Sequence, residues 1–182
     1  MKDTVYHMDS GRALVLSSRS TGARLIQLGL VFTAVLLPAV AHLSGAPVRW
    51  LLPMHWPVVF AALVYGIRGG VTVGALAPAT NYLLTGYPLL VKALPMTFEL
   101  AAYGLVIGWL RQKGWNSFAA VATGLAAGRI IFLGILLLTG ANEVPFGRYL
   151  VTAMVPGLAA GAGQVLLLSV LVNFLFSKHT IK

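Results

Sequence analysis

Six apolar stretches follow one another along the chain, separated by short segments with single charged or strongly polar residues. A helix needs about 20 mainly apolar residues to cross the roughly 30 Å hydrocarbon core of a bilayer. The stretches cover residues 25–45, 51–67, 70–84, 89–110, 117–138 and 149–176. They predict an all-α membrane protein with six transmembrane helices. We expect residues 1–22 to form an N-terminal tail, 23–176 the transmembrane domain and 177–182 a C-terminal tail.

The distribution of Lys and Arg predicts the orientation of these helices. An even number of crossings places both termini on one side, and cytoplasmic loops carry an excess of Lys and Arg. Nine such residues fall on the terminal side: Lys2, Arg12, Arg19, Arg24, Arg68, Arg111, Lys113, Lys178 and Lys182. Three fall on the other side: Arg49, Lys92 and Arg148. Both tails are therefore expected in the cytoplasm, and the loops around 44–52, 85–92 and 140–148 are expected to face outward.

Composition narrows the function without identifying it. The chain of 182 residues is 58% hydrophobic and 9% charged, with a formal net charge of +9. Its basic residues are scattered singly and form no stripe of the kind that binds nucleic acid. Cysteine is absent, which excludes disulfides and thiolate chemistry. The polar residues 1–20 are expected to be a tail and not a cleaved signal peptide.

The inventory of catalytic residues is small. Asp occurs only at Asp3 and Asp9, and the sequence contains no zinc-protease motif and no phosphate-binding loop with Gly-Lys-Ser/Thr. We therefore expect no enzymatic activity, no metal and no cofactor bound by this chain. If nucleotide drives its function, another subunit must hydrolyse the ATP.

Two charged residues lie well inside the predicted spans, Glu99 in the fourth and Arg129 in the fifth. A charge at the centre of a bilayer costs at least ~2.5 to 3.5 kcal/mol, so each side chain should face the bundle interior and find a partner. The simplest partner for each is the other. The pair can serve either to fix helix register or to contact a ligand, and the sequence favours neither role.

Other polar residues are predicted near the same depth or toward the outward ends of the spans. A lone His in such a place is more often structural than a ligand, and no second His or carboxylate stands near His55 to complete a metal site. Together with Glu99 and Arg129, these residues predict a mostly apolar pocket with a few polar contacts. They are Met54, His55, Asn81, Tyr82, Tyr103, Asn142 and Gln164.

Several short motifs, in order, resemble the substrate-binding S components of energy-coupling factor (ECF) transporters, of the broad folate, pantothenate and cobalamin type. The resemblance covers roughly residues 23–176. The motifs are Leu-Pro-Met-His-Trp-Pro-Val at 52–58, Gly-Ala-Leu-Ala-Pro at 74–78, Leu-Thr-Gly-Tyr-Pro at 84–88, Glu-Leu-Ala-Ala-Tyr-Gly-Leu at 99–105, Ala-Gly-Arg at 127–129, and Val-Pro-Gly at 155–157 with Gln164.

The resemblance implies a multi-pass protein of the prokaryotic plasma membrane. Such a subunit captures a vitamin or related micronutrient near the extracellular side, then docks with a transmembrane coupling subunit and two ATPase subunits that use the ATP. The implied substrate-binding residues are Met54, His55, Asn81, Tyr82, Glu99, Tyr103, Arg129 and Gln164.

Two features implied by the family are not fixed by this sequence. Its members commonly dock through small residues four apart on the first helix, where this chain has Gly29 with Thr33 and Ala34 with Pro38. The ligand also stays open. A planar amino-heterocycle would suit Glu99, an acid would suit Arg129, and a corrinoid would need a wide apolar mouth. From the residues alone, a structural subunit of a membrane complex and a small membrane enzyme are the alternatives.

Overall fold

The chain is described by a computed structural model that covers residues 21–140 and 145–177. Every regular element in these ranges is helical. The elements are α1 (Thr21–Leu43), α2 (Val48–Leu51), α3 (His55–Thr85), α4 (Leu90–Gln112), α5 (Ser117–Thr139), α6 (Phe146–Tyr149), the π-helical turn η1 (Leu150–Met154) and α7 (Val155–Ser177). The predicted tails lie almost wholly outside the described residues and stay predictions.

Five helices in the described ranges are long and apolar enough to cross a membrane: Thr21–Leu43, Val48–Thr85, Leu90–Gln112, Ser117–Thr139 and Gly147–Phe176. The distribution of side chains suits a lipid environment. Large apolar residues such as Leu28, Phe32 and Leu138 lie on the outside, whereas the polar Glu99 and Gln164 are buried. The prediction of an all-α membrane protein is confirmed at this level.

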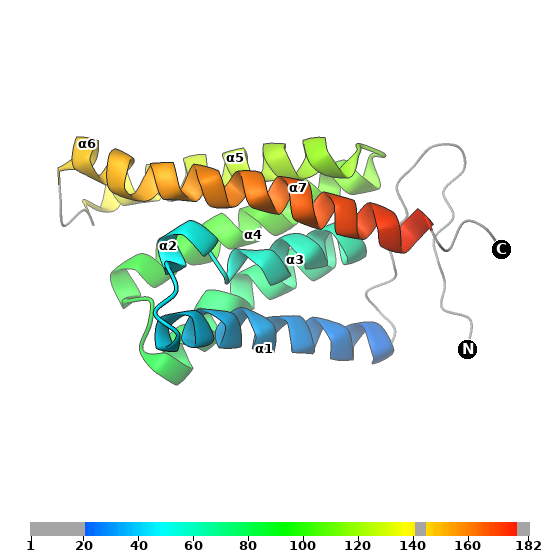
Figure 1. Cartoon of the computed structure of the whole chain (residues 1–182), viewed down its shortest axis with the longest axis horizontal. Helices are drawn as coiled ribbons and strands as arrows, with labels where there is room; N and C mark the ends of the chain where they lie inside the picture. Colours follow the sequence, from blue (N-terminus) through cyan, green and yellow to red (C-terminus); the bar gives the residue numbers. More distant parts are fainter. Residues whose placement is uncertain (1–20, 141–144, 178–182) are drawn as a thin grey trace.

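The helices form one elongated bundle (Figure 1). In this view α1 begins and α7 ends at the same end of the bundle, and the short helices α2 and α6 lie at the opposite end. This arrangement is what an even number of crossings would give.

The chain folds back on itself inside α3, at Gly66. This residue has φ 64° and ψ −154°, a conformation essentially restricted to glycine. Before Gly66, α3 runs in the same direction as α4: His55 lies beside Tyr103, and Gly66 lies beside Gly108. After Gly66 the direction is opposite, because Gly74 lies against Leu100. The boundary predicted around 68–69 is therefore a reversal at Gly66.

The segment before this reversal is shorter than the predicted span at 51–67. Helix α3 begins only at His55, so eleven residues at about 1.5 Å each give roughly 16 Å, half the thickness of the hydrocarbon core. Pro53 ends the preceding turn, and Pro57 is tolerated because it lies in the first turn of α3. The sixth complete crossing thus stays a prediction.

Glycines allow the second half of α3 and helix α4 to approach closely. A Cβ atom placed on Gly70 would lie 2.6 Å from the Gly104 Cα atom, and one on Gly108 would overlap the backbone at Ile67. Gly104 and Gly108 thus serve helix packing, and Gly124 lies against the Ile107 side chain. The bundle core lies along this crossing.

One pair of the candidate docking residues on the first helix is not available at the surface. Ala34 is fully buried and belongs to the core, and Pro38 is buried too. Gly29 is exposed, with nothing within 4 Å of a Cβ placed there, and Thr33 is half-buried. Ala34 and Pro38 lie on the face of α1 that packs into the bundle, so of the two pairs only Gly29 with Thr33 lies toward the surface.

Candidate functional site

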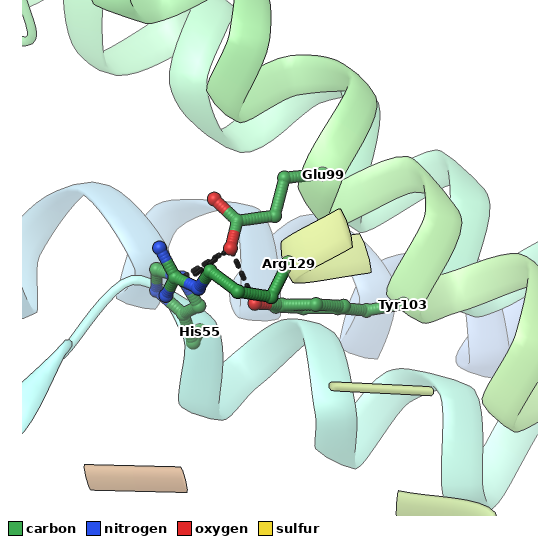
Figure 2. A network of polar contacts seen from close by, with 4 residues as sticks. All are labelled: His55, Glu99, Tyr103 and Arg129. Atoms are coloured by element: carbon green, nitrogen blue, oxygen red, sulfur yellow. Dashed lines mark hydrogen bonds and ion pairs between the residues drawn. The ribbon is translucent and has the colours of Figure 1, made fainter. Parts of the chain in front are cut away.

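A buried carboxylate near the middle of the bundle links α4 to α5 and lies close to α3. The Glu99 Oε1 atom on α4 lies 3.2 Å from the Arg129 Nη2 atom on α5 and accepts a 2.5 Å hydrogen bond from the Tyr103 hydroxyl. Glu99 is 1% exposed. Figure 2 shows the carboxylate between the two partners, with His55 of α3 on the same side. The predicted pairing of Glu99 with Arg129 is confirmed.

Helix geometry and one glycine bring these groups together. Glu99 and Tyr103 are four residues apart on α4, so their side chains lie one above the other on the same face. Gly128 lets α5 pack against this face, because a Cβ there would overlap the Tyr103 ring and lie 2.7 Å from the Glu99 carbonyl oxygen. Arg129, the next residue, then reaches the carboxylate. Gly128 therefore serves the polar cluster as well as helix packing.

His55 completes the cluster without a hydrogen bond of its own. Its Nε2 atom lies 4.0 Å from Glu99 Oε1, which is too far for a hydrogen bond. Its ring centroid lies 5.5 Å from that of Tyr103 at an angle of 49°. Both ring nitrogens are buried, and neither has a hydrogen-bond partner among the described residues. An unpaired buried imidazole is a group that a water molecule or ligand can satisfy.

The local fold explains how His55 reaches this depth. Leu52 ends α2 in the left-handed conformation, with φ 43° and ψ 57°. Its carbonyl oxygen accepts the His55 N–H at 3.0 Å, and the Trp56 indole donates to the Leu51 carbonyl oxygen at 2.7 Å. These bonds fix a tight turn that directs the start of α3 into the bundle. Trp56 thus has a specific structural role in this turn.

A cavity of about 400 Å³ lies between α5 and α7 and ends on this cluster. Its walls are mainly aliphatic and include Leu125, Leu133 and Val165. Small residues on α7 leave the space open: a Cβ on Gly157 would come 3.5 Å from Arg129 Nη2. The polar residues on its wall are His55, Tyr103, Arg129 and Gln164. We call it the α5–α7 cavity.

A second cavity, of about 690 Å³, lies beside the first and is bounded by α1, α3 and the turn after α3. We call it the α1–α3 cavity. Met54 and Asn81 line it, together with His42, Thr85 and Met96. Leu52 and His55 line both cavities, so the turn at 52–55 forms part of the wall between them.

The structure thus divides the eight predicted site residues into four groups. His55, Tyr103, Arg129 and Gln164 line the α5–α7 cavity, and Met54 and Asn81 line the α1–α3 cavity with His55. Glu99 lines neither cavity and forms an ion pair with Arg129, which does line the α5–α7 cavity. Tyr82 also lines neither: it is half-buried, and its carbonyl oxygen accepts the Gly86 N–H at 2.8 Å. Asn142 lies outside the described residues.

Sequence reasoning missed several residues that shape this site. Phe132 lies under the Arg129 guanidinium, 5.5 Å from its ring centroid. The spacing of Arg129 and Phe132, three apart on one helix, would have suggested this contact. Leu52 carried no signal, because a left-handed leucine is not apparent from residue type. Gly157 contributes space beside Arg129.

Comparison of the chain with protein-family models, curated proteins and solved structures found no match. The resemblance in its motifs is therefore the argument for a particular family, and the geometry described above is the argument for a ligand site.

Proposed function

We propose that this protein is a membrane-embedded substrate-binding subunit of an ECF-type importer. The observation that carries the proposal is the α5–α7 cavity, in which mostly aliphatic walls end on a small set of polar groups, with His55, Tyr103 and Gln164 buried and Arg129 half-buried. Small-molecule sites generally have this composition, with a few polar groups that orient the ligand. A volume of about 400 Å³ falls within the range for a compound of vitamin size.

The placement of the cavity supports capture and not turnover. His55, Tyr103 and Arg129 converge from three separate helices, so a ligand here would hold α3, α4 and α5 together. Among the described residues, no group of three or more His, Cys, Asp or Glu side chains has the arrangement that a metal requires. Small membrane enzymes that act on phosphates or peptide bonds often rely on such groups. We therefore favour binding over catalysis.

The membrane topology completes the proposal. Six crossings, counting the short segment of α3 before Gly66, would place both termini in the cytoplasm by the excess of Lys and Arg on that side. The Leu52–His55 turn and the start of α7 would then lie toward the extracellular side. The ligand would be a vitamin or related micronutrient, and partner ATPase subunits would supply the energy for release.

A structural role is the second candidate, and one observation favours it. Glu99 already has two partners, Tyr103 and Arg129, so the cluster is largely satisfied without a ligand. If it only fixes helix register, exchanging the charges in a Glu99→Arg/Arg129→Glu variant should restore the stability that either single change removes. A binding site should lose its ligand in all three variants.

Ligand binding is tested with protein purified in detergent. A thermal-shift screen against vitamins, their precursors and modified nucleobases should give a strong hit, because a ligand specific for the folded state adds ~2.7 kcal/mol at a hundredfold excess over Kd. The hit should disappear in Arg129→Ala and persist in Gly134→Ala, a change on the same helix with nothing within 4 Å. Flat curves from folded protein would favour the structural role.

The importer assignment needs a separate measurement. The tagged chain, isolated from its native membrane, should bring with it a transmembrane coupling protein and two ATPase chains. Isolation without any ATPase, together with a positive ligand screen, would indicate a binding protein of another class.

A further inference from the structure

The charges around the α5–α7 cavity are balanced before any ligand arrives. Arg129 is the one residue with a permanent charge among the described residues that line this cavity, and Glu99 stands 3.2 Å behind it. The α1–α3 cavity has no Lys, Arg, Asp or Glu on its described wall. A ligand anion would add a second negative charge, beside that of Glu99, next to the single positive charge of Arg129. A ligand cation would face the guanidinium. Either would leave an uncompensated buried charge, which is strongly unfavourable.

The hydrogen-bonding groups of the cavity nevertheless require a polar ligand. A guanidinium has five N–H donors, and the Glu99 contact engages the Nη2 atom, so Arg129 can still donate to an acceptor on the cavity side. A carbonyl oxygen is an acceptor that fits without adding charge. Gly157 leaves room for it, because a Cβ there would stand 3.5 Å from Nη2.

Gln164 places a second requirement on the hydrogen-bonding groups of the ligand. Its side chain on α7 is 0% exposed, and both Nε2 and Oε1 lack a hydrogen-bond partner among the described residues. Gln164 lines the same cavity. A buried amide with both atoms unpaired is unfavourable, and a partner with one donor next to one acceptor can form a hydrogen bond with each of them.

We propose that the α5–α7 cavity selects an uncharged ligand whose polar end is a carboxamide or a lactam. The carbonyl oxygen accepts from Arg129, the adjacent N–H and carbonyl group pair with the Gln164 amide, and the remaining ring or chain lies against the aliphatic walls. This inference rests on the proposed function and specifies the ligand class of that site. It also gives Glu99 a definite role, because the carboxylate makes the site neutral and thereby excludes acids.

Three probes of one shape and different charge test the selectivity: benzamide, benzoate and benzylamine, which is protonated at neutral pH. Their affinities are measured by ligand-observed NMR with detergent-solubilised protein. The wild type should bind benzamide about tenfold more tightly than either charged probe, the effect of about 1.4 kcal/mol of unbalanced charge. Glu99→Gln should reverse the preference toward benzoate, because Arg129 then lacks its counter-charge.

Two further variants keep the test independent of folding. Glu99→Gln/Arg129→Gln restores neutrality, so it should not prefer benzoate. Gln164→Leu should lose the discrimination between benzamide and N,N-dimethylbenzamide, which has no N–H donor. Circular dichroism and thermal unfolding establish that each variant is folded.

The outcomes separate this inference from the function on which it rests. A wild type that prefers benzoate, with a preference unchanged in Glu99→Gln, would overturn the neutral-ligand inference and leave a binding subunit that clamps acids through Arg129. No binding of any probe would overturn the inference as well. In that case a positive vitamin screen would retain the proposed function with a different recognition mode, and a negative one would remove both.

Discussion

The α3–α4 crossing offers a sharp test of the fold, through the change Gly70→Ala. A Cβ at this position would lie 2.6 Å from the Gly104 Cα atom, 2.7 Å from the Ala62 Cβ atom and 2.9 Å from the Gly104 carbonyl oxygen. Ordinary contact begins at 3.4 Å. None of these atoms is the end of a flexible side chain, so the added methyl group can be accommodated only by moving the backbone.

The size of the effect follows from that movement. The helices must separate by about 1 Å, and a gap of this size removes roughly a quarter to a half of the dispersion energy of the contacts it affects. Leu100 and Val73, both fully buried, are among the residues at this interface. Overpacking of this kind lowers the free energy of unfolding by about 1–3 kcal/mol.

The matched control is Gly134→Ala on α5, where nothing lies within 4 Å of the added Cβ. Both variants gain the same helix propensity, up to ~1 kcal/mol, so their difference isolates the steric effect. Thermal unfolding of the two proteins in one detergent measures it. Equal melting temperatures for the two variants would refute the close approach of α3 and α4.

Three further predictions concern single features of the structure. Gly66→Ala should lower the free energy of unfolding by about 1–3 kcal/mol, because φ 64° with ψ −154° is strained for any residue with a Cβ; circular dichroism during heating measures this, and wild-type stability would exclude the reversal at this residue. Asn116→Ala should lower it by about 0.5–2 kcal/mol, because the Asn116 Oδ1 atom accepts the Ala119 N–H at 2.8 Å as the N-cap of α5; Asn116→Asp should retain stability in the same melt. Glu99→Gln and Arg129→Gln should each destabilise by about 3–5 kcal/mol and the double variant by less than their sum; additive losses in a double-mutant cycle would show that the two residues are not coupled.

The sequence was most informative about residues that would be energetically unfavourable in lipid without a partner. Glu99 and Arg129 are charged residues in apolar stretches, and the high free energy of a lone charge in lipid requires that they meet. Their separation of 30 positions did not obscure this, because few other partners were available inside the spans. The spacing of Gly104 and Gly108 is also readable in the sequence, since glycines four apart in a membrane helix generally mark a close approach. For Glu99 and Arg129, the free-energy cost of a lone charge in lipid explains the observed contact.

The sequence was least informative where local backbone geometry set the depth of a residue. Hydropathy predicted a full second span, and it therefore placed His55 near the outward end of a helix. In the structure Pro53 and the left-handed Leu52 delay the start of α3, and Gly66 ends its first segment after eleven residues. His55 consequently lies at the depth of Glu99. Hydropathy averages over such features, because it measures composition and not dihedral angles.

The short first segment of α3 determines the position of the candidate site. A continuous helix from Leu51 to Ile67 would carry His55 away from the carboxylate and fill the space that the turn at 52–55 now divides into two cavities. The half-length segment instead leaves a wall of one short turn, in which Leu52 and His55 line a cavity on either side. The left-handed Leu52 and the His55 imidazole, whose ring nitrogens have no hydrogen-bond partner among the described residues, both belong to this shared wall.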